Sequence, residues 1–189
     1  MKNLFVVVIL LGWFAAPARA DYEAGMAAHD RGDYATAIRE VRPLAEKGDA
    51  MSQFYMGLTY HNGLGVSQDY KEAVRWIRLA AEQGIAEAQY LLGTTYTHGQ
   101  GVAQDYQEAV RWYRLAAKQG LAKAQLHLGL MYDGGNGVAE DTKEAQRWIR
   151  SAAEQGDAEA EHMLGMMYDL GKGGIQDSKE GARWTRLAA

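Results

Sequence analysis

The sequence contains no cysteine and only two prolines among its 189 residues. Without a thiol, the chain can form neither a disulfide nor a thiolate metal site, and it has no cysteine nucleophile. Its formal net charge of −4 leaves no surplus of lysine and arginine. Because phosphate neutralisation requires that surplus, nucleic acid is a disfavoured partner. Few prolines and an aromatic content of 10% also argue against a disordered chain.

Residues 1–20 have the pattern of a signal peptide. Lys2 precedes an apolar run from Leu4 to Ala16, and Ala18-Arg19-Ala20 places small residues where a signal peptidase cleaves. The run is shorter than the ~20 apolar residues that span a bilayer, so a retained anchor is the less favoured alternative. Cleavage would leave a mature chain from Asp21 with 18 basic and 24 acidic residues, a net charge of −6. We therefore expect a periplasmic or secreted protein with no stable membrane span after processing.

The remaining chain repeats itself every 36 residues. Three of the recurring slots are a glycine, an aspartate and a tryptophan: Gly57, Gly93, Gly129 and Gly165; Asp69, Asp105, Asp141 and Asp177; Trp76, Trp112, Trp148 and Trp184. Such periodicity is typical of solenoids, in which each repeat packs on its neighbours. We divide the chain into a divergent leading unit over 21–48 and repeats over 49–84, 85–120, 121–156 and 157–189, the last of them incomplete.

Each repeat reads as a pair of helices. In the first repeat, apolar and small residues at steps of three and four predict a helix over about 50–61, ended by Gly63 and Gly65. Asp69, with Glu72 three residues later, predicts the capped start of a second helix that buries Trp76. The leading unit shows two helices with a shorter turn. The predicted fold is all-α, a right-handed α-α superhelix of helix-turn-helix repeats.

The repeat pattern resembles a known family. The second repeat carries it almost completely: Ala86, Ala88-Gln89, Leu92-Gly93, Tyr96, Gly99, Gly101-Val102, Asp105-Tyr106, Glu108-Ala109, Trp112-Tyr113, Ala116-Ala117 and Gly120. These residues are similar to the Sel1-like repeat, a relative of the tetratricopeptide repeat, and the leading unit looks closer to a tetratricopeptide unit. The resemblance implies an adaptor that assembles protein complexes, often in bacterial envelope, secretion or host-interaction settings.

Nothing in the pattern indicates catalysis. The five histidines (His29, His61, His98, His127 and His162) form no His-Glu-x-x-His motif, so we expect no metal site. The recurring glycine loops join two helices and lack the strand and lysine of a phosphate-binding loop. Carboxylates that recur in every repeat indicate helix caps, whereas a catalytic pair would occur once. We expect no catalytic residue and no cofactor.

The first helices carry the candidate partner-binding surface. Slots beside the fixed stripe change from repeat to repeat and stay mostly apolar, as expected for an exposed interaction patch with adaptable methionines. These residues are Tyr55, Leu58, Leu91, Thr94, His127, Leu130, Met131, Met163, Met166 and Met167. The alternative is that they pack against the second helix of the adjacent repeat.

The second helices carry a candidate basic strip, to which each repeat contributes two arginines. Its members are Arg75, Arg78, Arg111, Arg114, Arg147 and Arg150, followed by Arg183 and Arg186. A docking strip for acidic partners or an anionic envelope surface is one interpretation. The other is a solvated face in which arginines pair with glutamates three residues earlier.

The leading hypothesis is a non-catalytic, exported scaffold that binds a peptide or protein segment on a concave face. One alternative is a cell-wall-directed enzyme or wall-ligand binder, because a cysteine-rich branch of the Sel1-like repeat family is linked to β-lactam binding. The absence of cysteine from this sequence argues against that alternative. Another is a self-assembling array, joined where Trp184 and Leu187 are expected to lie partly uncovered at an uncapped C-terminal end.

Overall fold

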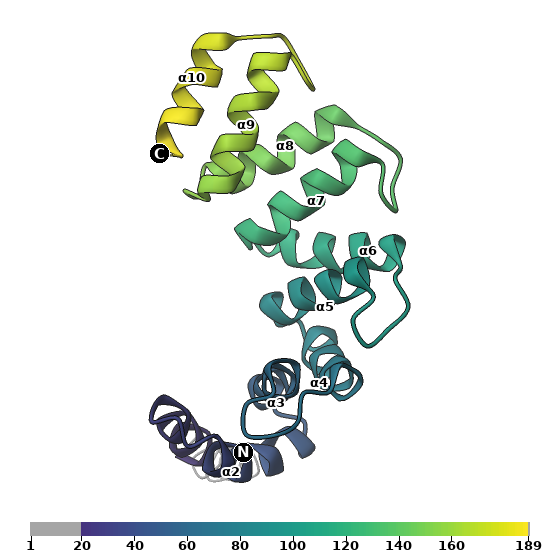
Figure 1. The fold of residues 1–189 in the computed structure, drawn as a ribbon. Coiled ribbons are helices and arrows are strands. Elements are labelled where there is room, and N and C mark those ends of the chain that lie inside the picture. The colour runs from purple at the N-terminus through teal and green to yellow at the C-terminus, as the bar shows by residue number, and fades with distance from the viewer. Residues whose placement is uncertain (1–19, 189) are drawn as a thin grey trace, which may run out of the picture. The chain divides into compact units, whose positions relative to one another are not determined.

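A computed structural model describes residues 20–188, and within that range the chain contains helices and no strand (Figure 1). Residues 20–30 are helical. The helices that follow are α2 (Tyr34–Glu46), α3 (Ala50–Asn62), α4 (Tyr70–Glu82), α5 (Ala86–His98), α6 (Tyr106–Lys118), α7 (Ala122–Gly134), α8 (Thr142–Ala153), α9 (Ala158–Leu170) and α10 (Ser178–Leu187). The predicted all-α repeat fold is confirmed. All of the predicted signal peptide except Ala20 lies outside the described residues.

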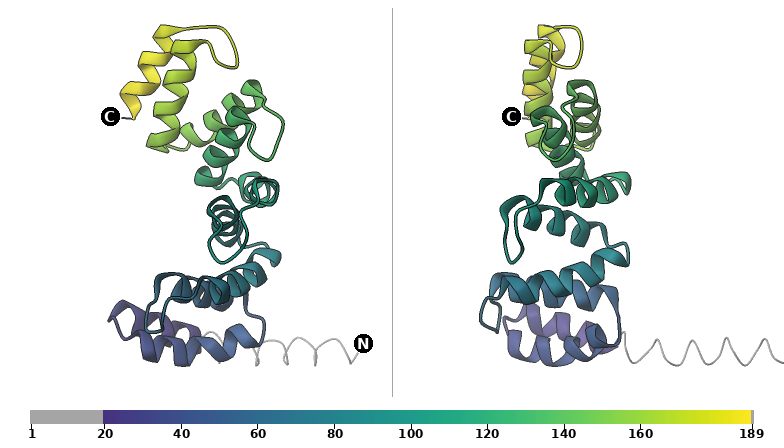
Figure 2. Two further views of the ribbon diagram at one scale, coloured as in Figure 1. Left: turned by 45° about the vertical axis from the view of Figure 1, so that its right-hand side comes forward. Right: turned by 90° about the vertical axis from the view of Figure 1, so that its right-hand side faces the viewer.

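The chain divides into two compact units between Gln83 and Gly84. In the first unit the helix of residues 20–30 is followed by α2, and α3 packs on both α2 and α4. In the second unit α5 pairs with α6, α7 with α8 and α9 with α10, while α6 packs on α7 and α8 on α9 (Figure 2). Each unit is therefore a stack of helical hairpins. No described helix is both long enough and apolar enough to cross a membrane.

The recurring aspartates cap the second helices, as predicted. Asp69 Oδ1 accepts hydrogen bonds from the backbone N–H groups of Lys71 (2.9 Å) and Glu72 (3.1 Å). The N–H of Asp69 itself donates to the carbonyl of Tyr60 at 3.0 Å. This bond satisfies the donor that a reciprocal capping box would use. The Glu72 side chain is therefore available to Arg75, to which it is paired.

A glycine inside each first helix lets the second helix of the hairpin approach closely. A Cβ added at Gly57 would lie 2.5 Å from Ile77 Cγ1, and one at Gly93 would lie 2.7 Å from the ring of Tyr113. Real Cβ atoms do not approach neighbours this closely, so the two helices could not keep this distance with alanine. Gly63 ends α3 with φ +70°, the left-handed conformation that glycine adopts without strain.

The recurring tryptophans lie between helices as expected, but not to the same depth. Trp76 is 4% exposed and Trp112 is 3% exposed. Trp76 belongs to a core cluster with Ile38, Val41 and Met56. Trp148 and Trp184 are only half-buried. The first two tryptophans are therefore more completely buried than the last two.

Candidate interaction surfaces

The first unit contains a pocket of about 310 Å³ at two of the predicted partner-binding slots. It lies between the helix of residues 20–30 and α3, and it continues to the loop after α3. Its lining residues are Met26, His29, Tyr55, Leu58, Thr59, Asn62 and Leu64. We call it the first-helix pocket.

One polar pair lies in the wall of the first-helix pocket. His29 Nδ1 is 3.2 Å from the hydroxyl of Tyr55, and the two rings meet edge to face at 5.5 Å. Burial raises the pKa of Tyr55 above its ordinary value, although a hydrogen bond with Thr59 opposes the shift. The phenol therefore stays neutral and can both donate and accept hydrogen bonds. The pocket combines aliphatic walls with a fixed polar pair.

In the second unit, Tyr113 connects two of the predicted residues. Its hydroxyl lies 3.2 Å from Thr94 Oγ1, and its ring lies 5.4 Å from that of His127. His127 also meets Tyr90 edge to face at 5.2 Å, and its Nδ1 lies 2.9 Å from the carbonyl of Lys123. Because Tyr113 is fully buried, its pKa is raised by desolvation, while hydrogen bonds with Thr94 and Thr97 act in the opposite direction. Thr94 and His127 thus both contact the buried side chain of Tyr113.

The remaining predicted residues differ in exposure. Met166 is 39% exposed, whereas Leu91, Leu130 and Met163 are half-buried; Leu130 and Met163 pack against the same core cluster. Met131 is 8% exposed and Met167 3% exposed, and both belong to core clusters. Those two methionines have almost no surface to offer a partner. Tyr55 is also only 8% exposed, but it still lines the pocket.

The first arginine of each predicted basic pair binds within its own helix. Arg75 Nη2 lies 3.1 Å from Glu72 Oε2, and the guanidinium lies 4.4 Å from the centroid of the Trp76 ring. The same glutamate pairing and ring stacking recur at Arg111, Arg147 and Arg183. These four arginines therefore fit the second interpretation of the strip, in which each arginine pairs with the glutamate three residues earlier.

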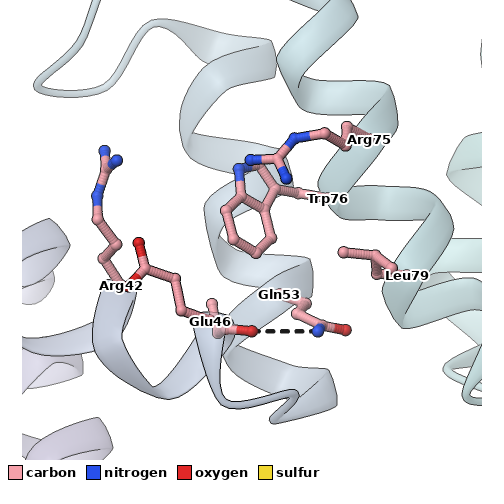
Figure 3. A pocket seen from close by; sticks show the side chains of 7 residues that line it. Arg42, Glu46, Gln53, Arg75, Trp76 and Leu79 are labelled. Atoms are coloured by element: carbon pink, nitrogen blue, oxygen red, sulfur yellow. Dashed lines mark hydrogen bonds between the residues drawn. The ribbon is translucent and has the colours of Figure 1, made fainter.

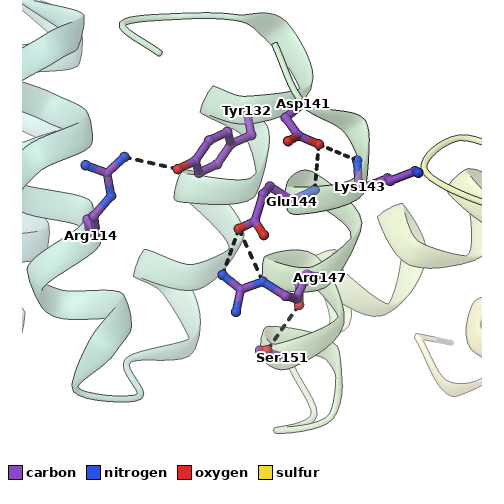
Figure 4. A network of polar contacts seen from close by, with 7 residues as sticks. All are labelled: Arg114, Tyr132, Asp141, Lys143, Glu144, Arg147 and Ser151. Carbon is purple, nitrogen blue, oxygen red and sulfur yellow. Dashed lines mark hydrogen bonds and ion pairs between the residues drawn. The ribbon is translucent and has the colours of Figure 1, made fainter. Parts of the chain in front are cut away.

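Two second arginines of these pairs, Arg114 and Arg150, bond to the following hairpin, as does Arg42 at the equivalent position of the leading unit. Arg42 Nη2 donates to the Tyr60 hydroxyl at 3.1 Å, and Arg114 Nη2 donates to the Tyr132 hydroxyl at 3.1 Å (Figure 4). Arg150 bonds in the same way to Tyr168. Arg78 is also engaged in an interaction. Arg42, Arg114 and Arg150 therefore join successive hairpins within their units, so the strip is less available as a docking surface than the sequence suggested.

Glutamines form a second set of contacts that the sequence analysis missed. Gln83 Nε2 donates to the carbonyl of Gly48 (3.0 Å) and to Gln53 Oε1 (2.7 Å). The same pair of bonds joins Gln119 to Gly84 and Gln89, and Gln155 donates to Gln125. The 30-residue spacing of these partners recurs in the sequence, and that repetition is the signal that could have revealed them. They tie the end of each second helix to the start of its hairpin.

Across residues 20–188, no group of three or more histidine, aspartate or glutamate side chains is placed to hold a metal ion. Asp133, in the last turn of α7, is paired with Lys172 Nζ at 3.0 Å. The recurring aspartates are used as caps and the recurring glutamates as arginine partners.

A model of the Sel1 repeat matches four consecutive segments, residues 50–85, 86–121, 122–157 and 158–189. Together these segments cover well over half of the chain. The chain belongs to the Sel1 repeat family. Sel1 repeat proteins are generally non-catalytic scaffolds for protein–protein interaction. A comparison with curated proteins gives no match.

Solved Sel1 repeat structures resemble the chain closely. The Escherichia coli protein c5321, described as a protective antigen of uropathogenic strains, is 37% identical with a TM-score of 0.87 over 95% of this chain and 40% of its own length. A Sel1 repeat protein from Oxalobacter formigenes is 34% identical with a TM-score of 0.83, over 88% of this chain and 69% of its own. This chain thus spans less than half the length of c5321. The Helicobacter pylori cysteine-rich protein B, 19% identical with a TM-score of 0.54 over 66% of this chain and 92% of its own, shares the fold alone.

Proposed function

We propose that this Sel1 repeat chain is an exported, non-catalytic scaffold that binds a peptide or protein segment through its first helices. The observation that carries the proposal is the first-helix pocket, which coincides with the predicted slots Tyr55 and Leu58. Stacked helical hairpins commonly bind partners along an extended surface made by one helix of each repeat.

The lining of the pocket defines what it would accept. Met26, Leu58 and Leu64 supply aliphatic walls, and methionine adapts to side chains of irregular shape. His29 and Asn62 supply hydrogen-bonding groups. A volume of about 310 Å³ is at the small end of ligand pockets and suits one large apolar side chain of a partner. The side chains of His29 and Asn62 could form hydrogen bonds with the partner's backbone.

The test compares two variants of α3. Leu58→Ala removes a wall of the pocket, whereas Met51→Ala changes a residue of the same helix that is 46% exposed and does not line the pocket. We expect the wild-type chain and the Met51 variant to capture the same protein from an envelope extract, and the Leu58 variant to lose it. Melting temperatures are measured for all three chains. Equal capture by the two variants would contradict the proposal.

Export is a separate part of the proposal and rests on residues 1–20. Expression of the full chain in a bacterial host should yield a processed protein in the periplasm or medium, with Asp21 at its N-terminus. The matched control lacks residues 2–20 and should remain in the cytoplasm. N-terminal sequencing that recovers intact Met1 from an envelope fraction would instead indicate the retained anchor.

A self-assembling array is a second candidate, favoured by exposed apolar side chains in the last repeat. Leu170 is 70% exposed, Ile175 89% and Leu187 57%. Burying such side chains against a second copy would remove apolar surface from water. Light scattering of the wild-type chain and of an Ile175→Lys, Leu187→Lys variant tests this candidate. An array requires the wild-type chain to associate and the variant to be monomeric, and a monomeric wild-type chain would rule it out.

A further inference from the structure

A second pocket of the first unit lies among α2, α3 and α4 and has a different chemistry. Its volume is about 430 Å³, and its lining residues are Arg42, Ala45, Glu46, Gln53, Arg75, Trp76 and Leu79. Two guanidinium groups stand at its rim, from α2 and from α4, with Trp76 and Leu79 as its apolar wall (Figure 3). We call it the arginine–tryptophan pocket.

Both rim arginines have donors left over after their contacts within the protein. Arg42 uses Nη2 for the Tyr60 hydroxyl, and Arg75 uses Nε and Nη2 for Glu72. A guanidinium carries five N–H donors in a fixed plane. The internal contacts therefore fix the two groups in position without saturating them. The Arg75 side chain is also 56% exposed, so a partner can reach it.

The base of the pocket is similarly fixed. Gln53 Nε2 donates to the Ala45 carbonyl at 3.1 Å (Figure 3), and its Oε1 accepts from Gln83. Trp76 is buried beneath the Arg75 guanidinium, and its Nε1–H has no hydrogen-bond partner. In Figure 3 this nitrogen lies on the edge of the indole nearest the guanidinium of Arg75. A preorganised site of this kind loses little side-chain entropy on binding.

We propose that the arginine–tryptophan pocket binds an acidic residue of a partner polypeptide, with a neighbouring aliphatic residue against Leu79. Arginine recognises carboxylates through paired, charge-assisted hydrogen bonds. Glu46 also lines the pocket and weakens its attraction for anions. At the equivalent slots of the second unit, Arg114, Arg147 and Trp148 recur, but Lys118 replaces Glu46. This surface is distinct from the first-helix pocket, so either proposal can fail without the other.

The probe is a fluorescein-labelled peptide in which two glutamates flank one leucine, and its control has glutamines in their place. Anisotropy titrations with the full chain should give at least about tenfold tighter binding of the glutamate peptide. The difference should shrink as sodium chloride rises from about 50 to 300 mM. The indole N–H signals in a nitrogen-correlated NMR spectrum report whether Trp76 is the tryptophan affected.

Two matched variants identify the site. Arg75→Gln should weaken binding of the glutamate peptide about tenfold, whereas Arg39→Gln, the same charge change on the outer side of α2, should leave it within about twofold. Glu46→Lys introduces the residue type that the second unit has at the equivalent position, Lys118. This variant should strengthen binding several-fold, and its result can be interpreted even if the Arg75 variant is unstable.

Three results would overturn the proposal. The first is equal binding of the glutamate and glutamine peptides, and the second is an equal loss from Arg75→Gln and Arg39→Gln, which would indicate charge attraction without a site. The third is Arg75-dependent binding to phosphatidylglycerol vesicles with no binding of the peptide. That outcome would assign the pocket to a membrane surface instead.

Discussion

At the scale of single residues, the helical glycines determine how closely the two helices of a hairpin can pack. A Cβ at Gly129 would lie 2.6 Å from Ile149 Cγ1 and 3.0 Å from the carbonyl oxygen of Ala145, which cannot move independently of α8. Gly134, in the same helix, would meet only the flexible end of the Asn136 side chain. The two positions differ in packing and share the helix, so they form a matched pair.

We predict that Gly129→Ala lowers the free energy of unfolding by about 1–3 kcal/mol, because overpacking outweighs the ~1 kcal/mol gained in helix propensity. Gly134→Ala should be neutral or slightly stabilising. Urea denaturation of both variants measures the difference. Equal stability of the two variants would mean that the helices can separate without cost.

A buried phenol makes stability depend on alkaline pH. Burial raises the pKa of Tyr113 above 10.0 in the folded chain, so the folded state retains its proton where the unfolded state loses it. The stabilisation is complete below pH 10.0 and is lost as pH rises through the folded pKa. Thr94 and Thr97 also donate to backbone carbonyls, so phenylalanine at this position leaves no unpaired hydroxyl donor.

We predict that the stability of the wild-type chain falls more steeply between about pH 9 and 11 than that of Tyr113→Phe. Urea denaturation across this range measures both slopes. Tyr22, Tyr55 and Tyr90 also have raised pKa values and remain in both proteins, so the variant keeps part of the dependence. Identical slopes would show that Tyr113 ionises as easily in the folded chain as in the unfolded one.

At the scale of helices, an aspartate cap marks the start of each second helix, and loss of the cap should lower stability. Asp105 Oδ1 accepts from the backbone N–H groups of Gln107 and Glu108. Asp105→Ala should cost about 0.5–2 kcal/mol, and Asp105→Asn, which keeps an acceptor oxygen, should cost less. Thermal melts of the two variants give the comparison. An equal loss for asparagine and alanine would show that the negative charge, not the hydrogen bond, is what matters.

The tryptophans provide a graded test of hairpin packing. Trp112 is 3% exposed, so Trp112→Ala should cost about 3–5 kcal/mol. Trp184 occupies the same slot in α10 but is half-buried, so the same change there should cost distinctly less. Denaturation of both variants measures this order. An unchanged melting temperature for Trp112→Ala would contradict the packing described here.

Helices, caps and close approaches were predictable because each leaves a local signal that recurs every 36 residues. The helix predicted over about 50–61 is α3, Ala50–Asn62, and the loop glycine and aspartate that flank the connection have the predicted roles. Contacts between hairpins were not predicted. Arg42 and Tyr60 lie 18 residues apart on different hairpins, and only the stacked arrangement brings them together.

The boundary between core and surface on the first helices was also beyond sequence reasoning. Neighbouring slots such as Met166 and Met167 have the same residue type, yet one is 39% exposed and the other 3%. The two side chains are one position apart and therefore point in different directions around the helix. Hydrophobicity alone does not show which of them faces the core. The pocket around Leu58 likewise depends on Met26 and His29, which come from the divergent leading unit.

At the scale of the whole molecule, the chain is an array of Sel1 repeats that offers two chemically distinct pockets in its first unit. The first-helix pocket suits an apolar side chain, and the arginine–tryptophan pocket suits an acidic one. Recognition through both pockets would require a partner segment with both kinds of residue. A double variant, Leu58→Ala with Arg75→Gln, should then lose more affinity than either single variant.

Amide hydrogen exchange with and without the captured partner tests the central claim most directly, because it maps the bound surface residue by residue. We expect slower exchange on binding in residues 26–29 and 55–64, around the first-helix pocket, and no such change in the Leu58→Ala chain. Slower exchange confined to α9 and α10, or none in the first unit at a saturating partner concentration, would contradict it.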